Sequence, residues 1–148
     1  MAFNDTKIKE ANTELESRLI KDRLDWQNRI INLVEQIKSM SSLSECQVNM
    51  LSYRQMLLDK VSELKNTIYK RNSAWERYYK NEYREYSLNY DLKLTTGEKH
   101  QFIKADLSSL KNQIDMLQGH IEYYQESIKT LDNMAFAIRN RIRLEDEE

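Results

Sequence analysis

The last third of the chain places an apolar side chain at every third or fourth position without a miss. Alternating steps of four and three put these residues on one narrow stripe of an α-helix, as in a coiled-coil seam. At 1.5 Å per residue this helix would be about 60 Å long, and it would need a partner along its whole length. The partner is expected to be another segment of this chain or another copy. The stripe consists of Ile103, Leu107, Leu110, Ile114, Leu117, Ile121, Tyr124, Ile128, Leu131, Ala135, Ile138 and Ile142.

The composition favours helix in the rest of the chain as well. The sequence has 148 residues, no proline and only two glycines, and 32% of its residues are charged. Proline and glycine are the usual helix breakers, while charged side chains supply solvated helix faces. We therefore predict an all-α fold in a single helical domain, residues 1–148, which is long enough to bury a core.

Two more stripes and two helix-start signals divide the chain into three long amphipathic helices. Ser42 with Glu45, and Thr95 with Glu98, have the spacing of capping boxes. The expected helices cover residues 5–39, 43–92 and 96–144, and an acidic tail follows at 145–148. The first stripe misses once, at Asp22–Arg23. The two stripes are Ile8, Ala11, Leu15, Leu19, Trp26, Ile30, Leu33 and Ile37, and then Cys46, Met50, Tyr53, Leu57, Val61, Leu64 and Ile68.

Three helices of unequal length cannot all cover one another within one chain. Some of the apolar seam would remain exposed, and a homo-oligomer is the simplest way to bury it. We therefore expect helical-bundle or coiled-coil-like packing with assembly of several copies. The candidate residues for the core or the oligomer seam are Trp75, Tyr79, Tyr83, Tyr86, Ile114, Leu117, Ile121, Tyr124, Ile128, Leu131 and Ile138.

The stretch "RNSAWERYYKNEYREYSLNY", residues 71–90, is rich in both aromatic and basic side chains. At 100° per residue, Trp75, Tyr79, Tyr83, Tyr86 and Tyr90 fall within an arc of about 80°, continuing the stripe of the middle helix. Tyr78 lies off this stripe. A tyrosine buries a large ring and keeps a polar tip, so a core or subunit interface is favoured. Stacking of nucleic-acid bases on these rings is the alternative.

The basic residues of this region lie on another side of the helix. Lys70, Arg77 and Arg84 are seven residues apart and form one row, and between residues 65 and 84 there are six basic and two acidic residues. Charge runs are commonly solvated faces with intrahelical ion pairs. Here Glu76 and Glu82 do not share the row, so it could follow a phosphate backbone. The candidate nucleic-acid-binding residues are Lys65, Lys70, Arg71, Arg77, Lys80 and Arg84.

Other features narrow the functional class. The net charge of −1 excludes a generally basic clamp around nucleic acid. The sequence has no nucleotide-binding loop, no metal-ligand spacing and no general acid–base pair, so we predict a protein that is not an enzyme and uses no cofactor. We expect His100 and His120 to be surface or boundary residues and Cys46 to be a buried thiol. Arg139, Arg141 and Arg143 would complement the dipole of the last helix.

The second half of the chain resembles the UvsY-like recombination mediator family of T-even-like bacteriophages. The resemblance covers roughly residues 65–142. It rests on the pair Tyr78–Tyr79 after a basic helix, on "EKHQFIKADLSSL" at 98–110 and on "IEYYQESIKTLDNMAFAIRNRI" at 121–142. Two departures are visible. The family often has a serine–glycine turn after its tyrosine pair, where this chain reads "YYKNEYREY", and its basic signature upstream is replaced by "IYKRNSAWERYY".

The resemblance implies a ring-like homo-oligomer that binds single-stranded DNA and helps a recombinase displace the single-strand-binding protein. It implies no catalysis by the chain itself, and Lys70, Arg71 and Arg77 are the nearest counterparts of the basic signature. No 18-residue apolar run is present. We therefore expect a protein without membrane contact, and the resemblance implies the cytoplasm of the infected bacterial host cell. The alternative is a coiled-coil scaffold or adaptor that does not bind nucleic acid. The unneutralised basic row distinguishes the two, because a scaffold does not need it.

Overall fold

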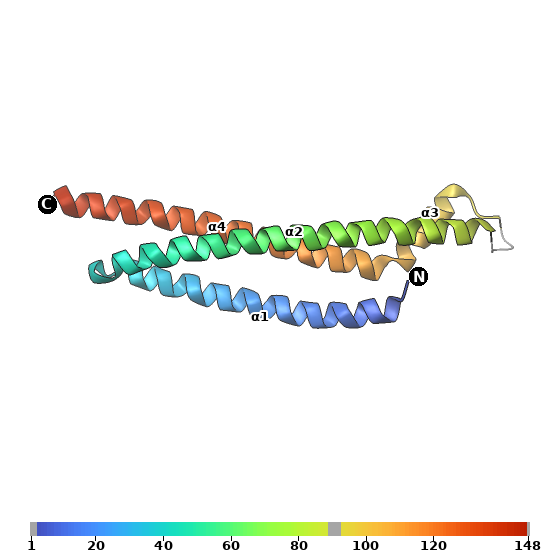
Figure 1. Ribbon diagram of the computed structural model, residues 1–148, viewed down its shortest axis with the longest axis horizontal. Coiled ribbons are helices and arrows are strands. Elements are labelled where there is room, and N and C mark those ends of the chain that lie inside the picture. Colours follow the sequence, from blue (N-terminus) through green and yellow to red (C-terminus); the bar gives the residue numbers. More distant parts are fainter. Residues whose placement is uncertain (1–2, 89–92, 148) are drawn as a thin grey trace. The chain divides into compact units, whose positions relative to one another are not determined.

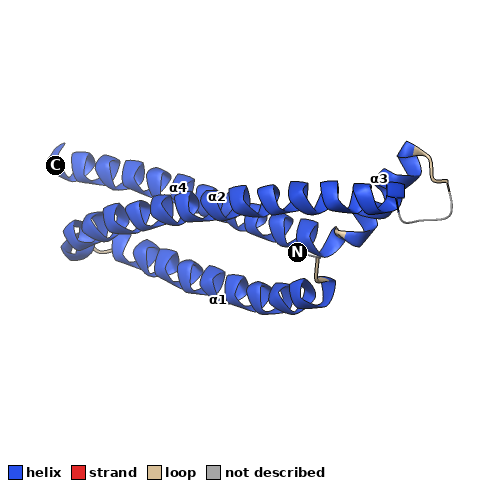
Figure 2. Ribbon diagram, turned by 45° about the vertical axis from the view of Figure 1, so that its right-hand side comes forward, coloured by secondary structure: helices blue, strands red, loops and turns tan. Residues whose placement is uncertain are grey.

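The computed structural model describes residues 3–88 and 93–147, and these are almost entirely helical (Figures 1 and 2). The elements are α1 (Asp5–Ile37), a 3-10 turn at Met40–Ser42, α2 (Leu43–Leu88), α3 (Thr96–Asp106) and α4 (Ser108–Glu147). No strand occurs among the described residues. The prediction of an all-α fold is confirmed.

Helices begin at residues 5, 43 and 96, the predicted starts, but the first ends at Ile37 and the last continues to Glu147, into the predicted acidic tail. A 3-10 turn leads directly into α2 at Leu43, the predicted first residue. The predicted end at residue 92 lies outside the described residues. Thr95 caps α3, because its side chain accepts a hydrogen bond from the Glu98 amide at 3.1 Å and its own amide donates to the Glu98 carboxylate at 3.2 Å. The capping box predicted there is confirmed.

The third predicted helix is wrong as a continuous element, because the structure has four helices and not three. Leu107, with φ −98° and ψ 12°, interrupts the helix between α3 and α4. The serine pair Ser108–Ser109 follows the break, and Ser109 contacts α1. The Ser109 hydroxyl donates to Asp5 at 2.6 Å, and its carbonyl accepts from the Asn12 amide group at 2.8 Å. Serine favours helix starts over helix interiors, because its side chain competes for local backbone groups.

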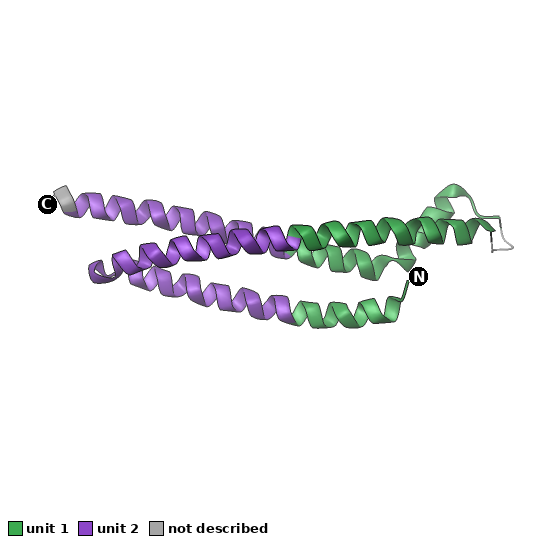
Figure 3. Cartoon of the chain, viewed as in Figure 1, with its two compact units in different colours: residues 1–17, 65–119 green, residues 18–64, 120–148 purple. Residues whose placement is uncertain are grey.

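The described chain forms two compact units, and each long helix contributes to both (Figure 3). Unit 1 contains Met1–Ser17 and Lys65–Gly119, and unit 2 contains Arg18–Leu64 and His120–Glu148. In unit 2, segments of α1, α2 and α4 enclose a core whose members are at most 4% exposed. They are Trp26, Leu33, Leu43, Cys46, Met50, Leu57, Ile121, Tyr124, Leu131 and Ile138.

Unit 1 has a smaller apolar core, centred on α3 and the first turns of α4. Ile103 and Leu107 are fully buried, and Leu110, Ile114 and Leu117 are nearly so. The N-terminal segment and the first turns of α1 contact the rest of this unit. The Gln113 side chain donates to the Asn12 side chain at 3.0 Å, and Phe3 packs edge-on against Tyr78 with 5.2 Å between ring centroids.

Burial follows the periodicity of the apolar stripe. Of the predicted seam residues in α4, Ile114, Leu117, Ile121, Tyr124, Leu131 and Ile138 are buried and Ile128 is half-buried. The missing step of the first stripe also has an explanation. Asp22 occupies that position in α1, and its carboxylate accepts hydrogen bonds from His120 and Tyr124 of α4. A buried polar cluster therefore takes the place of one apolar layer in unit 2.

Candidate nucleic-acid interface

The six basic residues predicted from the sequence all lie on the exposed surface of α2 in unit 1. We call the row Lys70, Arg77 and Arg84 the basic ridge, and every side chain in it is exposed. Lys80, Arg71 and Lys65 are exposed as well. At 1.5 Å per residue, neighbouring members of the ridge are about 10.5 Å apart along the helix.

The basic ridge makes no ion pair with any residue that the structure describes. The intrahelical ion pairs of the chain lie elsewhere, for example between Lys111 and Asp115 at 3.1 Å. The guanidinium of Arg77 lies 6.0 Å from the centre of the Tyr78 ring, at the limit of a cation–π contact. The charge of the ridge is therefore available to an anionic partner.

The tyrosines of the aromatic stretch pack α2 against α3. Tyr79 hydrogen-bonds to Nδ1 of His100, and the two rings stack with centroids 5.5 Å apart. The ring centroid of Tyr83 lies 5.6 Å from that of the same histidine, and the Lys99 ammonium lies 5.3 Å from the centre of the Tyr83 ring. Tyr86 stacks on Phe102, with centroids 6.0 Å apart. These half-buried rings lie at the contact between α2 and α3 in unit 1, and Tyr90 lies outside the described residues.

Two carboxyl groups, those of Glu82 and Asp106, also lie at the contact between α2 and α3. The Tyr86 hydroxyl donates to Asp106 at 2.5 Å, and Glu82 hydrogen-bonds to the same aspartate. Burial, the hydrogen bond and the negative charges of Asp106 and Glu85 raise the pKa of Glu82 from 4.5 to about 7. Close to neutral pH, Glu82 is therefore partly protonated, which lowers the negative charge of unit 1.

A groove of about 460 Å³ lies on unit 1, between α2 and the junction of α3 with α4. Asn72 and Trp75 of α2 form one side of the groove, and Lys104, Lys111 and Ile114 form the other. The Trp75 ring is half-buried and packs beside Tyr79, with centroids 4.9 Å apart. Both lysines are exposed. The sequence pattern does not mark Lys104 and Lys111 as part of this site, because their position beside α2 depends on the break at Leu107.

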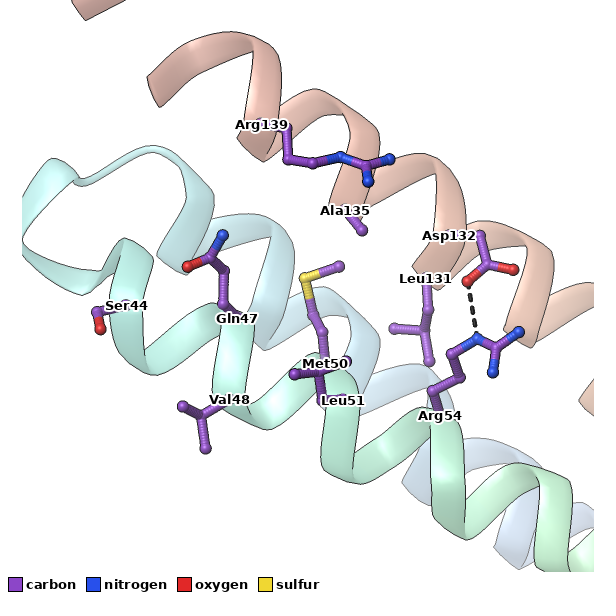
Figure 4. A pocket seen from close by; sticks show the side chains of 10 residues that line it. All are labelled: Ser44, Gln47, Val48, Met50, Leu51, Arg54, Leu131, Asp132, Ala135 and Arg139. Carbon is purple, nitrogen blue, oxygen red and sulfur yellow. Dashed lines mark hydrogen bonds and ion pairs between the residues drawn. The ribbon is translucent and has the colours of Figure 1, made fainter. Parts of the chain in front are cut away.

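Unit 2 has a larger and more apolar groove between α2 and α4, of about 650 Å³ (Figure 4). Figure 4 shows side chains of both helices around it, with the ion pair between Arg54 and Asp132 at one end, 2.9 Å long. Two of its lining residues on α2 are strongly exposed for apolar side chains, Val48 at 63% and Leu51 at 72%. These two side chains expose apolar surface on this part of unit 2.

A buried polar cluster of unit 2 was missed in the sequence analysis. The expectation of a surface or boundary position for His120 is wrong, since this residue is 1% exposed and its Nε2 lies 2.8 Å from Asp22. Burial opposes ionisation of Asp22, but the hydrogen bonds from Tyr124 and His120 outweigh it, and the pKa of Asp22 is lowered. Burial, followed by the bond to Asp22, raises the pKa of Tyr124. In the sequence, the signal for this cluster was the missing apolar residue at Asp22 in the first stripe.

Cys46 and Arg141 have structural contacts. Cys46 is fully buried, as expected, its thiol lies 3.7 Å from the Leu33 carbonyl, and burial raises its pKa. Arg141 donates hydrogen bonds to the carbonyls of Ile37 and Lys38, so it satisfies the C-terminal end of α1. Arg139 and Arg143 are exposed.

Neither a metal centre nor a membrane span is found in the part of the chain that the structure describes. No three histidine, cysteine, aspartate or glutamate side chains gather there as ligands would around a metal ion. No described helix is both long and apolar enough to cross a bilayer. Comparisons with known proteins give no match to any family model, curated protein or solved structure.

Proposed function

We propose that this chain is a recombination mediator that binds single-stranded DNA as an oligomer and helps to load a recombinase in place of single-strand-binding protein. The observation that carries the proposal is the basic ridge on α2. Its three exposed cations repeat every seven residues and have no acidic partner among the described residues. A row of unpaired cations can contact several phosphates of one nucleic-acid strand, and a folded core does not need it.

The near-neutral charge of the chain favours an oligomeric binder. Three to five phosphate contacts by one copy give weak binding that salt easily reverses. If several copies present the ridge to one strand, the effective affinity rises by multivalency, and the strand can still be released to another protein. A mediator needs both properties.

Exposed apolar residues of unit 2 support self-assembly. Ile20, Leu24, Ile31 and Val34 of α1 are 43–57% exposed, and they follow one another at steps that fit a second helical stripe. Val48 and Leu51 of α2 are further exposed apolar residues of unit 2. A stripe of this size on an isolated chain is a candidate for burial against another copy.

The roles of the recombinase and the single-strand-binding protein come from the family resemblance. In this scheme the chain supplies no catalysis, and the recombinase supplies the nucleotide hydrolysis. The basic ridge would hold the DNA strand while the recombinase replaces the single-strand-binding protein on it.

Fluorescence anisotropy of a labelled single-stranded oligonucleotide, titrated with protein at several salt concentrations, tests the proposal. With three to five phosphate contacts per copy, we expect the logarithm of the affinity to fall with the logarithm of salt at a slope of about −2 to −3.5. The triple variant K70E/R77E/R84E should bind weakly and keep its assembly state. A matched control reverses three exposed basic residues of α1, Lys7, Arg18 and Lys21.

The alternative is a scaffold or adaptor without nucleic-acid binding, and the apolar groove of unit 2 is the observation in its favour (Figure 4). The same titration separates the two functions. Absence of binding at low salt favours the scaffold. Loss of assembly in the K70E/R77E/R84E variant would place the ridge in a subunit interface and remove the basis for DNA binding.

A further inference from the structure

We infer that the groove of unit 1 is a nucleotide-sized site for single-stranded nucleic acid, in which a base stacks on Trp75 and the adjoining phosphates contact Lys104 and Lys111. This inference rests on the proposed function and adds to the basic ridge a second surface, built from three helices. It also assigns a role to two lysines outside the aromatic and basic stretch of α2.

Trp75 differs from the tyrosines that follow it along the stripe. Tyr79, Tyr83 and Tyr86 each have a ring partner on α3, and the first of these is hydrogen-bonded there. The ring partner of Trp75 is Tyr79 of its own helix, and the indole lines the groove. A half-buried indole fixed by a neighbouring ring is a preorganised platform for a base, because every base offers a flat π-surface.

The charges of the groove suit the rest of a nucleotide. Lys104 is exposed and makes no ion pair with the described residues, and Lys111 has only its exposed intrahelical pair with Asp115. Such exposed pairs contribute little stability, so a phosphate can compete for the Lys111 ammonium. Asn72 adds an amide group that can donate and accept hydrogen bonds at the groove wall.

The size and the composition of the groove favour this ligand class over a protein segment. Its volume of about 460 Å³ lies within the range of small-molecule sites and can accept one base with its sugar. Ile114, 7% exposed, gives the groove an apolar residue, while the other side-chain ends are an indole, an amide and two ammonium groups. An amphipathic helix would require several apolar anchor points, which the groove of unit 2 offers and this one does not.

The intrinsic fluorescence of the protein provides a direct test. The chain has two tryptophans, and Trp26 is 1% exposed inside the core of unit 2. Addition of unlabelled oligo(dT) at low salt should therefore quench the emission of Trp75 and shield it from acrylamide. The variant W75F keeps a ring at this position and should lose the DNA-dependent quenching, which assigns the signal to this residue.

Two lysine variants test the phosphate contacts without disturbing the core. K104Q/K111Q should weaken binding by at least about tenfold at low salt and reduce the salt slope by about 1.4, since each lost phosphate contact removes about 0.7. Lys129 matches Lys111, because it is exposed on the same helix and pairs with Glu126 at 3.1 Å. Lys21 of α1 is exposed and matches Lys104. K21Q/K129Q should bind as the unaltered protein does.

The outcomes separate this inference from the proposed function. An anisotropy increase with quenching of Trp75 and weaker binding by K104Q/K111Q supports the groove. An anisotropy increase with unchanged Trp75 emission, or with full affinity of K104Q/K111Q, overturns the groove and leaves the basic ridge as the binding surface. No anisotropy change at low salt overturns both.

Discussion

Loss of the Asp22 carboxylate should destabilise unit 2, because two buried side chains of its polar cluster depend on this acceptor. In the variant D22A, the Nε2 of His120 and the Tyr124 hydroxyl both lose the acceptor that now binds them. Both donor residues are nearly inaccessible, at 1% and 4% exposed. A buried polar group without a partner costs about 1–3 kcal/mol. The Asp22 side chain itself is 29% exposed, so water can reach part of the vacated site.

These terms give an expected loss of about 2–4 kcal/mol in the free energy of unfolding. For a chain of this size, 1 kcal/mol shifts the melting temperature by about 2–4 °C, so Tm should fall by roughly 5–15 °C. Urea denaturation followed by circular dichroism measures the first quantity, and thermal melts measure the second. Because hydrogen bonds lower the pKa of Asp22, its contribution is present above the ordinary value of 3.8 and is lost as pH falls through the folded-state pKa.

An apolar replacement of the whole cluster should recover most of this loss. The variant D22L/H120L/Y124F has no buried donor left, and it also removes the Nδ1 of His120, which has no partner among the described residues. Replacing all partners by apolar groups of similar shape can be close to neutral, whereas removing one partner is costly. A D22A loss below about 0.5 kcal/mol, or a triple variant no more stable than D22A, would refute this account of the cluster.

Three further outcomes are expected. The pKa of Glu82 is about 7 in the fold against 4.5 ordinarily, so its stabilising contribution is complete below pH 4.5 and is lost as pH rises to about 7. The variant E82Q should remove this pH dependence of stability. After allowance for solvent screening, urea denaturation at pH 8 should show a free energy of unfolding about 1–2 kcal/mol higher than that of the unaltered protein. T95A should cost about 1 kcal/mol, because the cap of α3 is lost; an unchanged midpoint would contradict this. L24S/I31S should lower the assembled mass in analytical ultracentrifugation if the exposed stripe of α1 joins copies, and the control S17A on the same helix should not.

The sequence was sufficient for the class of fold and for most of its buried positions. Apolar spacing depends only on helix geometry, so it singled out Ile114, Leu131 and Ile138, which are buried in the structure. It did not reveal the break at Leu107, because Leu107 is itself a buried member of the stripe and keeps the apolar phase across the break. The serines after it were the local signal, and their partners Asp5 and Asn12 lie about a hundred residues earlier in the sequence.

Polar side chains within the stripes show where pattern reasoning ends. The gap at Asp22 looks like a defect until His120 and Tyr124 are known to lie opposite it. A carboxylate and a histidine in separate helices carry no mutual signature in sequence, since their pairing depends on the register between α1 and α4. The same holds for His100, whose contacts to Tyr79 and Tyr83 depend on where α3 returns to α2.

The aromatic stretch of α2 contains side chains with different tasks, and helix geometry separates them. At 100° per residue, Trp75 and Arg77 point about 200° apart, so the groove and the basic ridge lie on nearly opposite sides of the helix. The tyrosines turn toward α3 and hold the helix in place. A strand that contacts both surfaces must pass around α2, which is about 10–12 Å wide with its side chains. The two surfaces then contact different atoms of the strand. The losses in binding free energy caused by ridge variants and by groove variants should therefore add for a long strand.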